Sequence, residues 1–302
     1  MVQQPRPKSV QSVSKACPSA GLFHCGRHRL RLDRPLVMGI LNITPDSFSD
    51  GGRHIHLAQA LDAAHRMKAD GADILDIGGE STRPGAAPVD PSEELQRVGP
   101  VLEALQDIGL PLSLDSRRPS VVDAALDIGI DLINDVGGFK DPEMQALLRD
   151  PRARGLGVCV MHMQGEPQQM QKSPSYESVV EEVHGFLHRQ QQLLEGLGVA
   201  PESILLDPGF GFGKTLDHNL ALFDSLDLLC GQHRVLVGVS RKRMIGQLSA
   251  REDAPAHERL GGSLAAAVLA AQAGASVIRV HDVRETVDAL RVWRVLNAAI
   301  VS

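Results

Sequence analysis

Eight short runs of apolar residues alternate along this chain with longer amphipathic segments, and this alternation is the strongest constraint on its fold. Each run is apolar at consecutive positions, the pattern of a strand buried on both faces in a parallel sheet. The segments between the runs repeat their apolar residues at helical spacing. The predicted strands are Val37–Leu41, Asp73–Ile77, Pro111–Leu114, Asp131–Ile133, Leu156–Met161, Ser203–Leu206, Val235–Val239 and Ala275–Val280. The predicted helices include Leu57–Ala69, Pro91–Leu105, Pro119–Ile128, Ser178–Leu197 and Leu260–Ala273.

Eight strand–helix units are typical of a (β/α)8 barrel, which usually has about 250 residues. Small residues end two of the predicted helices just before a strand, at Gly71-Ala72-Asp73 and Gly274-Ala275-Ser276. An open doubly wound sheet is the alternative, but it rarely contains eight such even units. We therefore expect an α/β fold, a single (β/α)8 TIM barrel over residues 22–302, preceded by a flexible basic tail at residues 1–21.

Charge is unevenly distributed between the two ends of the chain. Residues 1–34 contain seven Lys and Arg against one acid, Asp33, whereas the rest contains 24 basic and 36 acidic residues. An acidic body with only seven Phe, one Trp and one Tyr argues against a nucleic-acid partner. The basic stretch shares its composition with transit peptides, but a tail that leads into a strand pair around Leu22–Leu32 is the better interpretation.

Hydropathy and cysteine usage bear on the compartment. No apolar run reaches the roughly 18 residues of a membrane span, so no membrane association is expected. The cysteines Cys17, Cys25, Cys159 and Cys230 form no CxxC pair, which argues against a disulfide framework and against a thiolate zinc site. A reducing cytoplasm is the expected location.

Polar residues stand at the carboxyl ends of the predicted strands, where a barrel of this kind places its chemistry. A single Asn or Asp there is more often a turn or cap residue. Polar residues after all eight strands converge on one rim, however, and helix capping alone does not predict that convergence. They are Asn42, Asp76 to Glu80, Asp115, Asn134, His162, Asp207, Ser240 to Lys242, and Arg279 with His281. The rim is therefore predicted to be a binding site.

The predicted site divides into two halves. Asp115, Asn134, Asp207 and Lys242 offer the donors and acceptors that suit a flat heterocycle with amide and amino groups, because a carboxylate binds two N–H groups strongly and directionally. Each of these residues alone has a bland alternative, as an N-cap, a turn residue or a solvated surface base.

The other half suits an anion. Arg83, Arg279 and His281 accompany the loops Thr44–Gly52 and Ser81–Gly85, whose backbone N–H groups and hydroxyls suit phosphate oxygens. Asn42 offers an amide oxygen to Mg²⁺, an ion that commonly shares substrate phosphates instead of occupying a full protein cage. The alternative is that both loops are long connections with no special role.

Two other motifs do not match the sites they suggest. The segment Pro208–Thr215, PGFGFGKT, is close to a P-loop, but Pro208 replaces its first glycine. Ser240 lies in GVSRK and not in the GxSxG turn of a hydrolase nucleophile.

Taken in order, these segments closely resemble the dihydropteroate synthase family, from about Phe23 to about Val292. The blocks that carry the resemblance are Gly39–Gly52 (GILNITPDSFSDGG), Gly71–Gly85 (GADILDIGGESTRPG), Leu114–Pro119 (LDSRRP), Asn134–Gly138 (NDVGG), Val160–Gly165 (VMHMQG), Leu206–Lys214 (LDPGFGFGK), Gly238–Gly246 (GVSRKRMIG) and Ile278–Val283 (IRVHDV). The resemblance implies a (β/α)8 transferase of folate biosynthesis that joins a pterin diphosphate to 4-aminobenzoate. It also implies a sulfonamide-type aminobenzoate pocket and a homodimer. The Leu260–Ala273 helix, rich in Ala and Gly, is a candidate dimer surface, but ordinary core packing explains its composition equally well.

Residue roles are carried over by motif. The resemblance implies a pterin set of Asp115, Asn134, Met161, Asp207 and Lys242, and a diphosphate set of Thr82, Arg83, Arg279 and His281. It implies aminobenzoate contacts from Phe48, Pro84, Phe212 and Ser240, with Asn42 as the Mg²⁺ ligand. Asp115, Lys242 and Arg83 are the expected catalytic residues. Two alternatives are a pterin-binding methyltransferase with a corrinoid partner and a non-catalytic pterin-binding paralogue. The first has no use for the diphosphate set, and the second would tolerate gaps among the strand-end residues.

Overall fold

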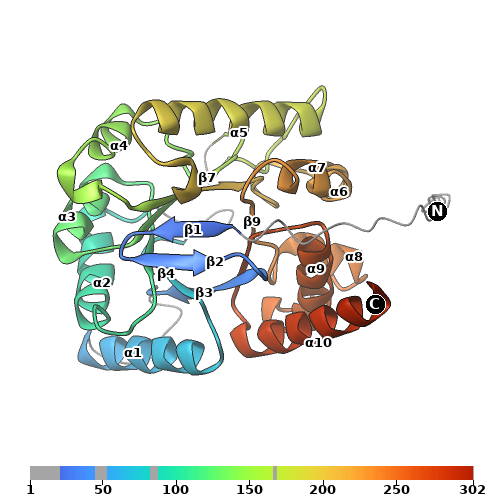
Figure 1. Ribbon diagram of the computed structural model, residues 1–302, viewed down its shortest axis with the longest axis horizontal. Helices are drawn as coiled ribbons and strands as arrows, with labels where there is room; N and C mark the ends of the chain where they lie inside the picture. Colours follow the sequence, from blue (N-terminus) through green and yellow to red (C-terminus); the bar gives the residue numbers. More distant parts are fainter. Residues whose placement is uncertain (1–20, 45–52, 82–87, 166–168, 302) are drawn as a thin grey trace.

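The computed structural model describes residues 21–44, 53–81, 88–165 and 169–301, which form a parallel barrel surrounded by helices (Figure 1). Within these residues, one eight-stranded sheet runs in the order β8-β7-β6-β5-β4-β3-β10-β9. The sheet closes where Leu206 of β8 pairs with Val235, directly before β9, and its N–H donates to the Arg234 carbonyl at 2.9 Å. The predicted single (β/α)8 barrel is confirmed, and the open doubly wound sheet is excluded.

The strands coincide with the predicted apolar runs to within one or two residues at each end. They are β3 Leu36–Asn42, β4 Ile74–Gly78, β5 Leu112–Asp115, β6 Leu132–Asp135, β7 Gly157–Met161, β8 Ile204–Asp207, β9 Leu236–Val237 and β10 Val277–Val280. Because both faces of these strands are covered, by the barrel interior and by the helices, most of their residues are fully buried.

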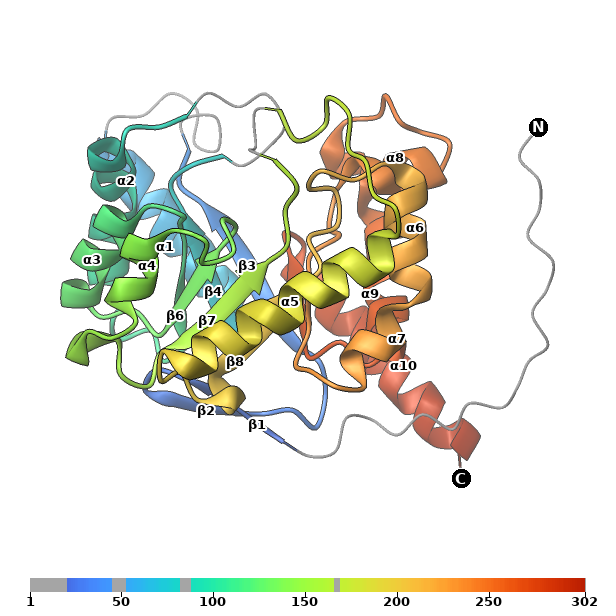
Figure 2. The same ribbon diagram turned by 90° about the horizontal axis from the view of Figure 1, so that it is seen from above.

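Helices cover the outside of the barrel in both views (Figures 1 and 2). They are α1 Arg53–Ala69, α2 Pro91–Ala104, α3 Pro119–Ile128, α4 Pro142–Leu147, α5 Val179–Gly196, α6 Leu216–Asp224, α7 Leu226–Cys230, α8 Arg243–Leu248, α9 Leu260–Gln272 and α10 Val283–Val301. The described residues also form short 3₁₀ turns, η2 Pro151–Ala153, η3 Pro201–Ser203 and η4 Ala256–Arg259. Local signals fix several starts, because Asp90, Asp141 and Ser178 accept hydrogen bonds from backbone N–H groups of the first turn.

A hairpin of β1 Leu22–Cys25 and β2 His28–Arg31 covers the amino-terminal end of the barrel, at the lower edge of Figure 2. Phe23 is fully buried against the beginnings of the barrel strands. The turn residue Gly26 has φ +56°, and a Cβ there would collide with Asp131, so the turn requires glycine. The predicted strand pair is confirmed. Of the predicted tail, residues 1–20 lie outside the described part of the chain.

Candidate active site

The carboxyl ends of the strands bring together most of the predicted site residues that the structure describes. Asn42, Asp115 and Asp207 are the last residues of β3, β5 and β8, and Asn134 is the penultimate residue of β6. Arg279 lies on β10, while Ser240, Lys242 and His281 follow β9 and β10. Four predicted residues, Phe48, Thr82, Arg83 and Pro84, lie outside the described residues.

A cluster of ion pairs at this rim links β10 with β4 and β5, across the intervening strand β3. Arg279 Nε donates to Asp76 Oδ2 of β4 at 2.6 Å, and its Nη2 donates to Asp115 Oδ2 at 2.5 Å. Asp76, which is fully buried, also accepts from Asn134 Nδ2 at 3.1 Å and from Ser113 Oγ at 2.5 Å. The Asp76 carboxylate is therefore shared by the predicted pterin residue Asn134 and the predicted diphosphate residue Arg279. Arg279 in turn pairs with the predicted pterin residue Asp115.

Asp76 is the site residue to which sequence reasoning gave no role. It stood among the polar rim residues, yet its position offered a stronger signal. Asp76 is the middle residue of the five-residue strand β4, whose other residues are apolar or glycine. A charge inside a strand that is buried on both faces requires a charged or hydrogen-bonding partner.

Burial destabilises the charged form of two rim carboxylates. Burial raises the pKa of Asp115 to about 7; the Arg279 charge opposes this shift, and the Asp76 charge adds to it. Burial also raises the pKa of Asp207, against the opposing charge of Lys242. These carboxyl groups have lost the hydrogen bonds of water, and protein donors replace only some of them. Such incompletely paired groups are characteristic of sites that bind or transform a ligand.

The Lys242 ammonium group contacts a backbone carbonyl and an aromatic ring at the same rim. Its Nζ donates to the Phe210 carbonyl at 2.5 Å and lies 4.5 Å from the centre of the Phe212 ring. Burial lowers the pKa of Lys242 to about 8, although the Asp207 and Asp115 charges oppose this shift. The lysine is therefore a half-buried cation with directional contacts and not a solvated surface base.

The apolar part of the rim is built largely from methionine. Met161, at the end of β7, is 2% exposed and packs with Val136, Met163 and Met170, and the Phe212 ring packs against this cluster. Flexible, polarisable thioethers make favourable contacts with aromatic rings. The cluster thus provides an apolar wall beside the charged residues.

Two residues predicted for different substrates contact each other. The Ser240 hydroxyl lies 3.1 Å from Nδ1 of His281 and accepts the His281 backbone N–H at 3.2 Å. Ser240 is nearly buried, so His281 fixes the direction of its hydroxyl.

The connection that carries Thr82, Arg83 and Pro84 is tied at both of its ends. Glu80 Oε1, just after β4, accepts the Val89 N–H at 3.2 Å from the far end of the connection. Arg117, beyond β5, pairs with Glu80 Oε2 at 3.2 Å. Because of these contacts, the ends of this segment are fixed next to Asp115.

Asn42 is the rim residue whose side chain is predicted to bind a magnesium ion. Among the described residues, no group of three or more His, Cys, Asp or Glu could hold a metal ion by itself. Asn42 is half-buried at the end of β3, and its amide oxygen has no hydrogen-bond partner within the described part of the chain. One amide oxygen suits Mg²⁺ that keeps water and phosphate oxygens as its other ligands.

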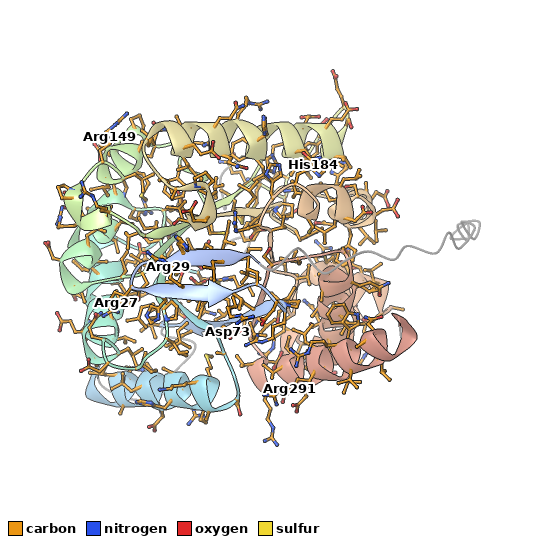
Figure 3. All side chains as sticks on the ribbon, in the orientation of Figure 1. Arg27, Arg29, Asp73, Arg149, His184 and Arg291 are labelled. Carbon is orange, nitrogen blue, oxygen red and sulfur yellow. The ribbon has the colours of Figure 1, made fainter. Side chains whose placement is uncertain are left out.

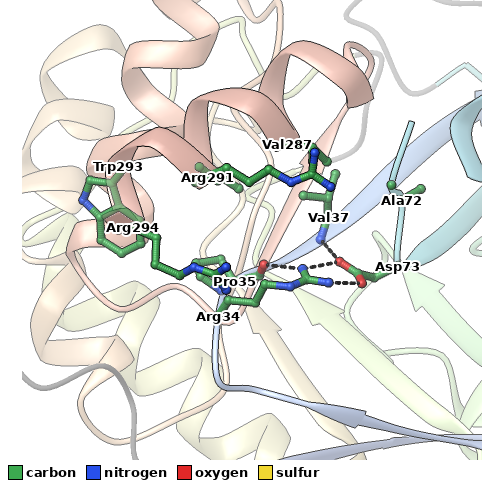
Figure 4. A pocket seen from close by; sticks show the side chains of 11 residues that line it. Arg34, Pro35, Val37, Ala72, Asp73, Val287, Arg291, Trp293 and Arg294 are labelled. Atoms are coloured by element: carbon green, nitrogen blue, oxygen red, sulfur yellow. Dashed lines mark hydrogen bonds and ion pairs between the residues drawn. The ribbon is translucent and has the colours of Figure 1, made fainter. Parts of the chain in front are cut away.

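A cavity of about 330 Å³ lies at the opposite end of the barrel, and the charged groups Arg34 and Asp73 in its wall bind each other (Figure 4). Arg34 donates to both oxygens of Asp73, at 2.7 and 2.6 Å, and Asp73 also accepts the Val37 N–H at 2.8 Å. These bonds join the beginnings of β3 and β4 below α10. Figure 3 labels Asp73, together with Arg27 and Arg29 of the hairpin, in the orientation of Figure 1.

Comparisons with known proteins agree with this geometry. The model of the family described as pterin binding enzyme matches residues 38–281. The chain is 49% identical to the dihydropteroate synthase of Neisseria meningitidis serogroup C over 280 residues, 91% of this chain and 98% of that protein. Its fold is similar to the Xanthomonas albilineans dihydropteroate synthase with 4-aminobenzoic acid (TM-score 0.85, 46% identity, 93% and 99% of the two chains). It is also similar to the Burkholderia cenocepacia dihydropteroate synthase complexed with 7,8-dihydropteroate (TM-score 0.82, 47% identity, 93% and 98%).

Proposed function

The chain belongs to the dihydropteroate synthases, within the pterin binding enzymes, and from this premise we propose how its rim residues divide the reaction. The enzyme is a transferase of folate biosynthesis. It condenses (7,8-dihydropterin-6-yl)methyl diphosphate with 4-aminobenzoate and gives 7,8-dihydropteroate and pyrophosphate. The observation that carries the assignment of roles is the buried Asp76–Arg279–Asp115 cluster beside Lys242 at the strand ends.

The pterin binds against the buried carboxylates and the methionine wall in this proposal. Asp207 and Asp115 accept N–H groups of the pterin edge, and Asn134 offers its amide beside them. The Lys242 ammonium donates to a ring acceptor, and Met161 packs on the flat face of the ring. Substrate N–H groups would supply the hydrogen bonds that the buried carboxylates lack.

The diphosphate binds to Arg279 and His281, together with Thr82 and Arg83 of the connection after β4. Arg279 uses Nε and Nη2 for Asp76 and Asp115, and its Nη1 has no hydrogen-bond partner among the described residues. This nitrogen is available to a phosphate oxygen while the two ion pairs stay intact. Arg279 is thereby held in place by Asp76 and by Asp115, and Asp115 is itself a proposed pterin contact.

Magnesium fits the proposal through Asn42, whose amide oxygen would hold it beside the diphosphate. When bound, Mg²⁺ supplies positive charge that stabilises the departing pyrophosphate.

Bond breaking precedes bond making in the proposed mechanism. The C–O bond to the diphosphate breaks with its electron pair leaving on pyrophosphate, and the resulting cation is stabilised by the electron-rich pterin ring. Asp115 stabilises this cation electrostatically, while Arg279, Arg83 and His281 stabilise the leaving group. The arylamine nitrogen then forms the C–N bond and loses a proton to solvent, so a strong protein base is not required.

4-Aminobenzoate occupies the side of the rim nearest Phe212 and Ser240. The Phe212 ring forms one wall, Phe48 and Pro84 form others, and Ser240 with Lys242 binds the carboxylate. Ser240 can donate its one hydroxyl proton to this carboxylate when His281 carries a proton on Nδ1 and donates it to the hydroxyl oxygen.

The test is pyrophosphate release by the purified protein, with the pterin diphosphate and Mg²⁺, in the presence and absence of 4-aminobenzoate. Amine-dependent release with formation of dihydropteroate is the expected result. Tight pterin binding without release would favour the binding paralogue or the corrinoid methyltransferase, to be tested next with methyl donors.

We also propose a homodimer formed through α9 and α10. Leu269 on α9 and Val292, Val295 and Leu296 on α10 are between 53% and 66% exposed, an apolar surface that a second copy would bury. Sedimentation velocity should show a dimer that Val295→Glu converts to a monomer; a monomeric wild type would contradict the proposal.

We also propose a cytoplasmic location. Cys25 and Cys159 are free thiols in buried positions, as expected in a reducing compartment. None of the helices in the described ranges is long and apolar enough to cross a bilayer. Fractionation with a compartment marker tests this location.

A further inference from the structure

Lys214 is a buried lysine to which the proposed reaction assigns no role. It follows the 208–213 segment, the one that resembles a P-loop in sequence, and only 3% of it is exposed. In a P-loop, this lysine would point outward to a phosphate. Here its Nζ donates to the carbonyls of Gly209 at 2.9 Å and Phe212 at 3.1 Å. It also lies 3.0 Å from His162 Nδ1 and 3.3 Å from the His162 carbonyl.

The partner histidine is held in the neutral form. Burial, and then the charges of Lys214 and Lys140, lower the pKa of His162 to about 3. Because an ammonium group only donates, His162 Nδ1 accepts and the ring proton is assigned to Nε2. Burial lowers the pKa of Lys214 itself to about 7, against the charge of Asp207 and with those of Lys242 and Lys140. The ammonium group is therefore expensive to bury, and its acceptors at the end of β7 and in the 208–213 segment offset that cost.

The 208–213 segment is bent around this ammonium group. Gly209, Gly211 and Gly213 have φ values of +68°, +78° and +61°. A Cβ on Gly209 would collide with the His162 carbonyl, so the two backbones approach as closely as glycine allows. The N–H of Gly209 donates to Asp207 Oδ1 at 2.7 Å, and that of Gly211 donates to Asn219 Oδ1 at 2.8 Å. The shape of the segment is thus fixed from both sides.

The 208–213 segment also contacts Lys242. The Phe210 carbonyl accepts a hydrogen bond from Lys242 Nζ, and the centre of the Phe212 ring lies 4.5 Å from the same nitrogen. We propose that Lys214 is a positioning residue: by tying the 209 and 212 carbonyls to His162, it places the Phe210 carbonyl and the Phe212 ring where they orient Lys242 for the pterin and the aminobenzoate. The inference rests on the proposed role of Lys242.

A double-mutant cycle separates this role from general support of the fold. Lys214→Met removes the ammonium and keeps the length of the chain, and Lys242→Met removes the group on which it is inferred to act. We expect Lys214→Met to weaken 7,8-dihydropteroate binding by about 20-fold in isothermal titration calorimetry, and to weaken it less than about 2-fold in the Lys242→Met background. Lys214→Arg, which keeps the charge, should recover part of the affinity.

Lys140→Met is the matched control, because Lys140 is exposed and contributes positive charge to the same region without contacting the 208–213 segment. It should leave binding within about 2-fold in both backgrounds. Equal losses from Lys214→Met in both backgrounds, or no loss, would overturn the inference.

If Lys214→Met does not fold, His162→Leu removes an acceptor of the same ammonium and should show the same dependence on Lys242. Wild-type amine-dependent pyrophosphate release is measured first. Its absence would contradict the proposed function, whereas its presence with an additive cycle would contradict only the role of Lys214.

Discussion

The two ends of the barrel shift the pKa of a buried aspartate in opposite directions. At the amino-terminal end, Asp131 is buried at the beginning of β6, yet its pKa is lowered. Burial raises this pKa, but hydrogen bonds from Arg27 and from the Leu112 N–H outweigh it. At the carboxyl-terminal end, burial raises the pKa of Asp115 and of Asp207. A buried aspartate is thus stabilised as an anion at one end and destabilised at the other.

The difference lies in how many donors the protein itself supplies. The Asp131 carboxylate accepts from Arg27 N, Nε and Nη2 and from Leu112 N, at 3.0 to 3.1 Å. Within the described residues, Asp115 accepts a hydrogen bond from Arg279 alone. A carboxylate with a full set of protein donors is structural, whereas one with an incomplete set is prepared for the donors of a ligand.

The largest effect on catalysis should follow from neutralising Asp115, the carboxylate with an incomplete set of protein donors. Asp115→Asn keeps the shape of the side chain but removes the charge that stabilises the cation, so we expect kcat/KM to fall by about 10²- to 10³-fold. The melting temperature should not fall, because the buried charge is costly and Arg279 keeps Asp76. Steady-state kinetics and thermal denaturation measure the two, with Asp33→Asn as an exposed control. Turnover near the wild-type value would contradict the role of Asp115.

The reverse pattern is expected at the other end. Asp131→Asn should cost about 2 kcal/mol in the free energy of unfolding, since an amide cannot satisfy the same four donors, while kcat/KM stays close to the wild-type value. Because the folded-state pKa of Asp131 is lowered, its stabilisation is present above pH about 4 and is lost as the pH falls. The variant should therefore show a flatter loss of stability in acid, measured by urea unfolding from pH 3 to 7. A loss of activity with unchanged stability would remove the contrast between the two ends.

The sequence predicted the barrel because its signals are local. Apolar runs such as Leu156–Met161 can be buried only as strands covered on both sides, and Pro119–Ile128 is observed with the predicted bounds. The strand-end position of Asp115, Asn134 and Asp207 follows from the same periodicity. The segment after β9 was harder to predict, because β9 itself has only the two residues Leu236–Val237 of the predicted 235–239 run.

Contacts between distant strands could not be predicted in the same way. Arg279 and Asp76 are 203 positions apart in the sequence, and nothing in either local segment indicates that they pair. In the P-loop pattern that Lys214 resembles, the lysine points to a bound phosphate. The inward direction of Lys214 depends instead on the curvature set by Gly209 and Gly213. Such tertiary partners are set by strand order and register and not by composition.

The pH dependence of the reaction should show the titration of two groups at the carboxyl-terminal end, Asp115 and Lys242. Ionised Asp115 and protonated Lys242 are required, and their pKa values are about 7 and about 8. The value of kcat/KM should therefore rise toward pH 7 and fall above pH 8, by about 10-fold per unit on each limb. Asp115→Asn should lose the acid limb and keep the alkaline one. If the acid limb persists, it belongs to Asp207, whose pKa burial also raises.

The smallest expected effect concerns the aromatic contact of Lys242. Phe212→Leu keeps an apolar wall beside Met161 but removes the ring face below the ammonium, an interaction of about 1 kcal/mol. We expect about a 5-fold increase in the KM for 4-aminobenzoate, with kcat close to the wild-type value, because the ring is proposed to touch the amine substrate and the lysine but not the departing diphosphate. Phe223→Leu is the matched control, since Phe223 packs against the buried Phe210 ring behind the same segment. An equal rise in KM in both variants would mean that each substitution merely loosens the 208–213 segment, and the proposed contact of the Phe212 ring with the substrate would be wrong.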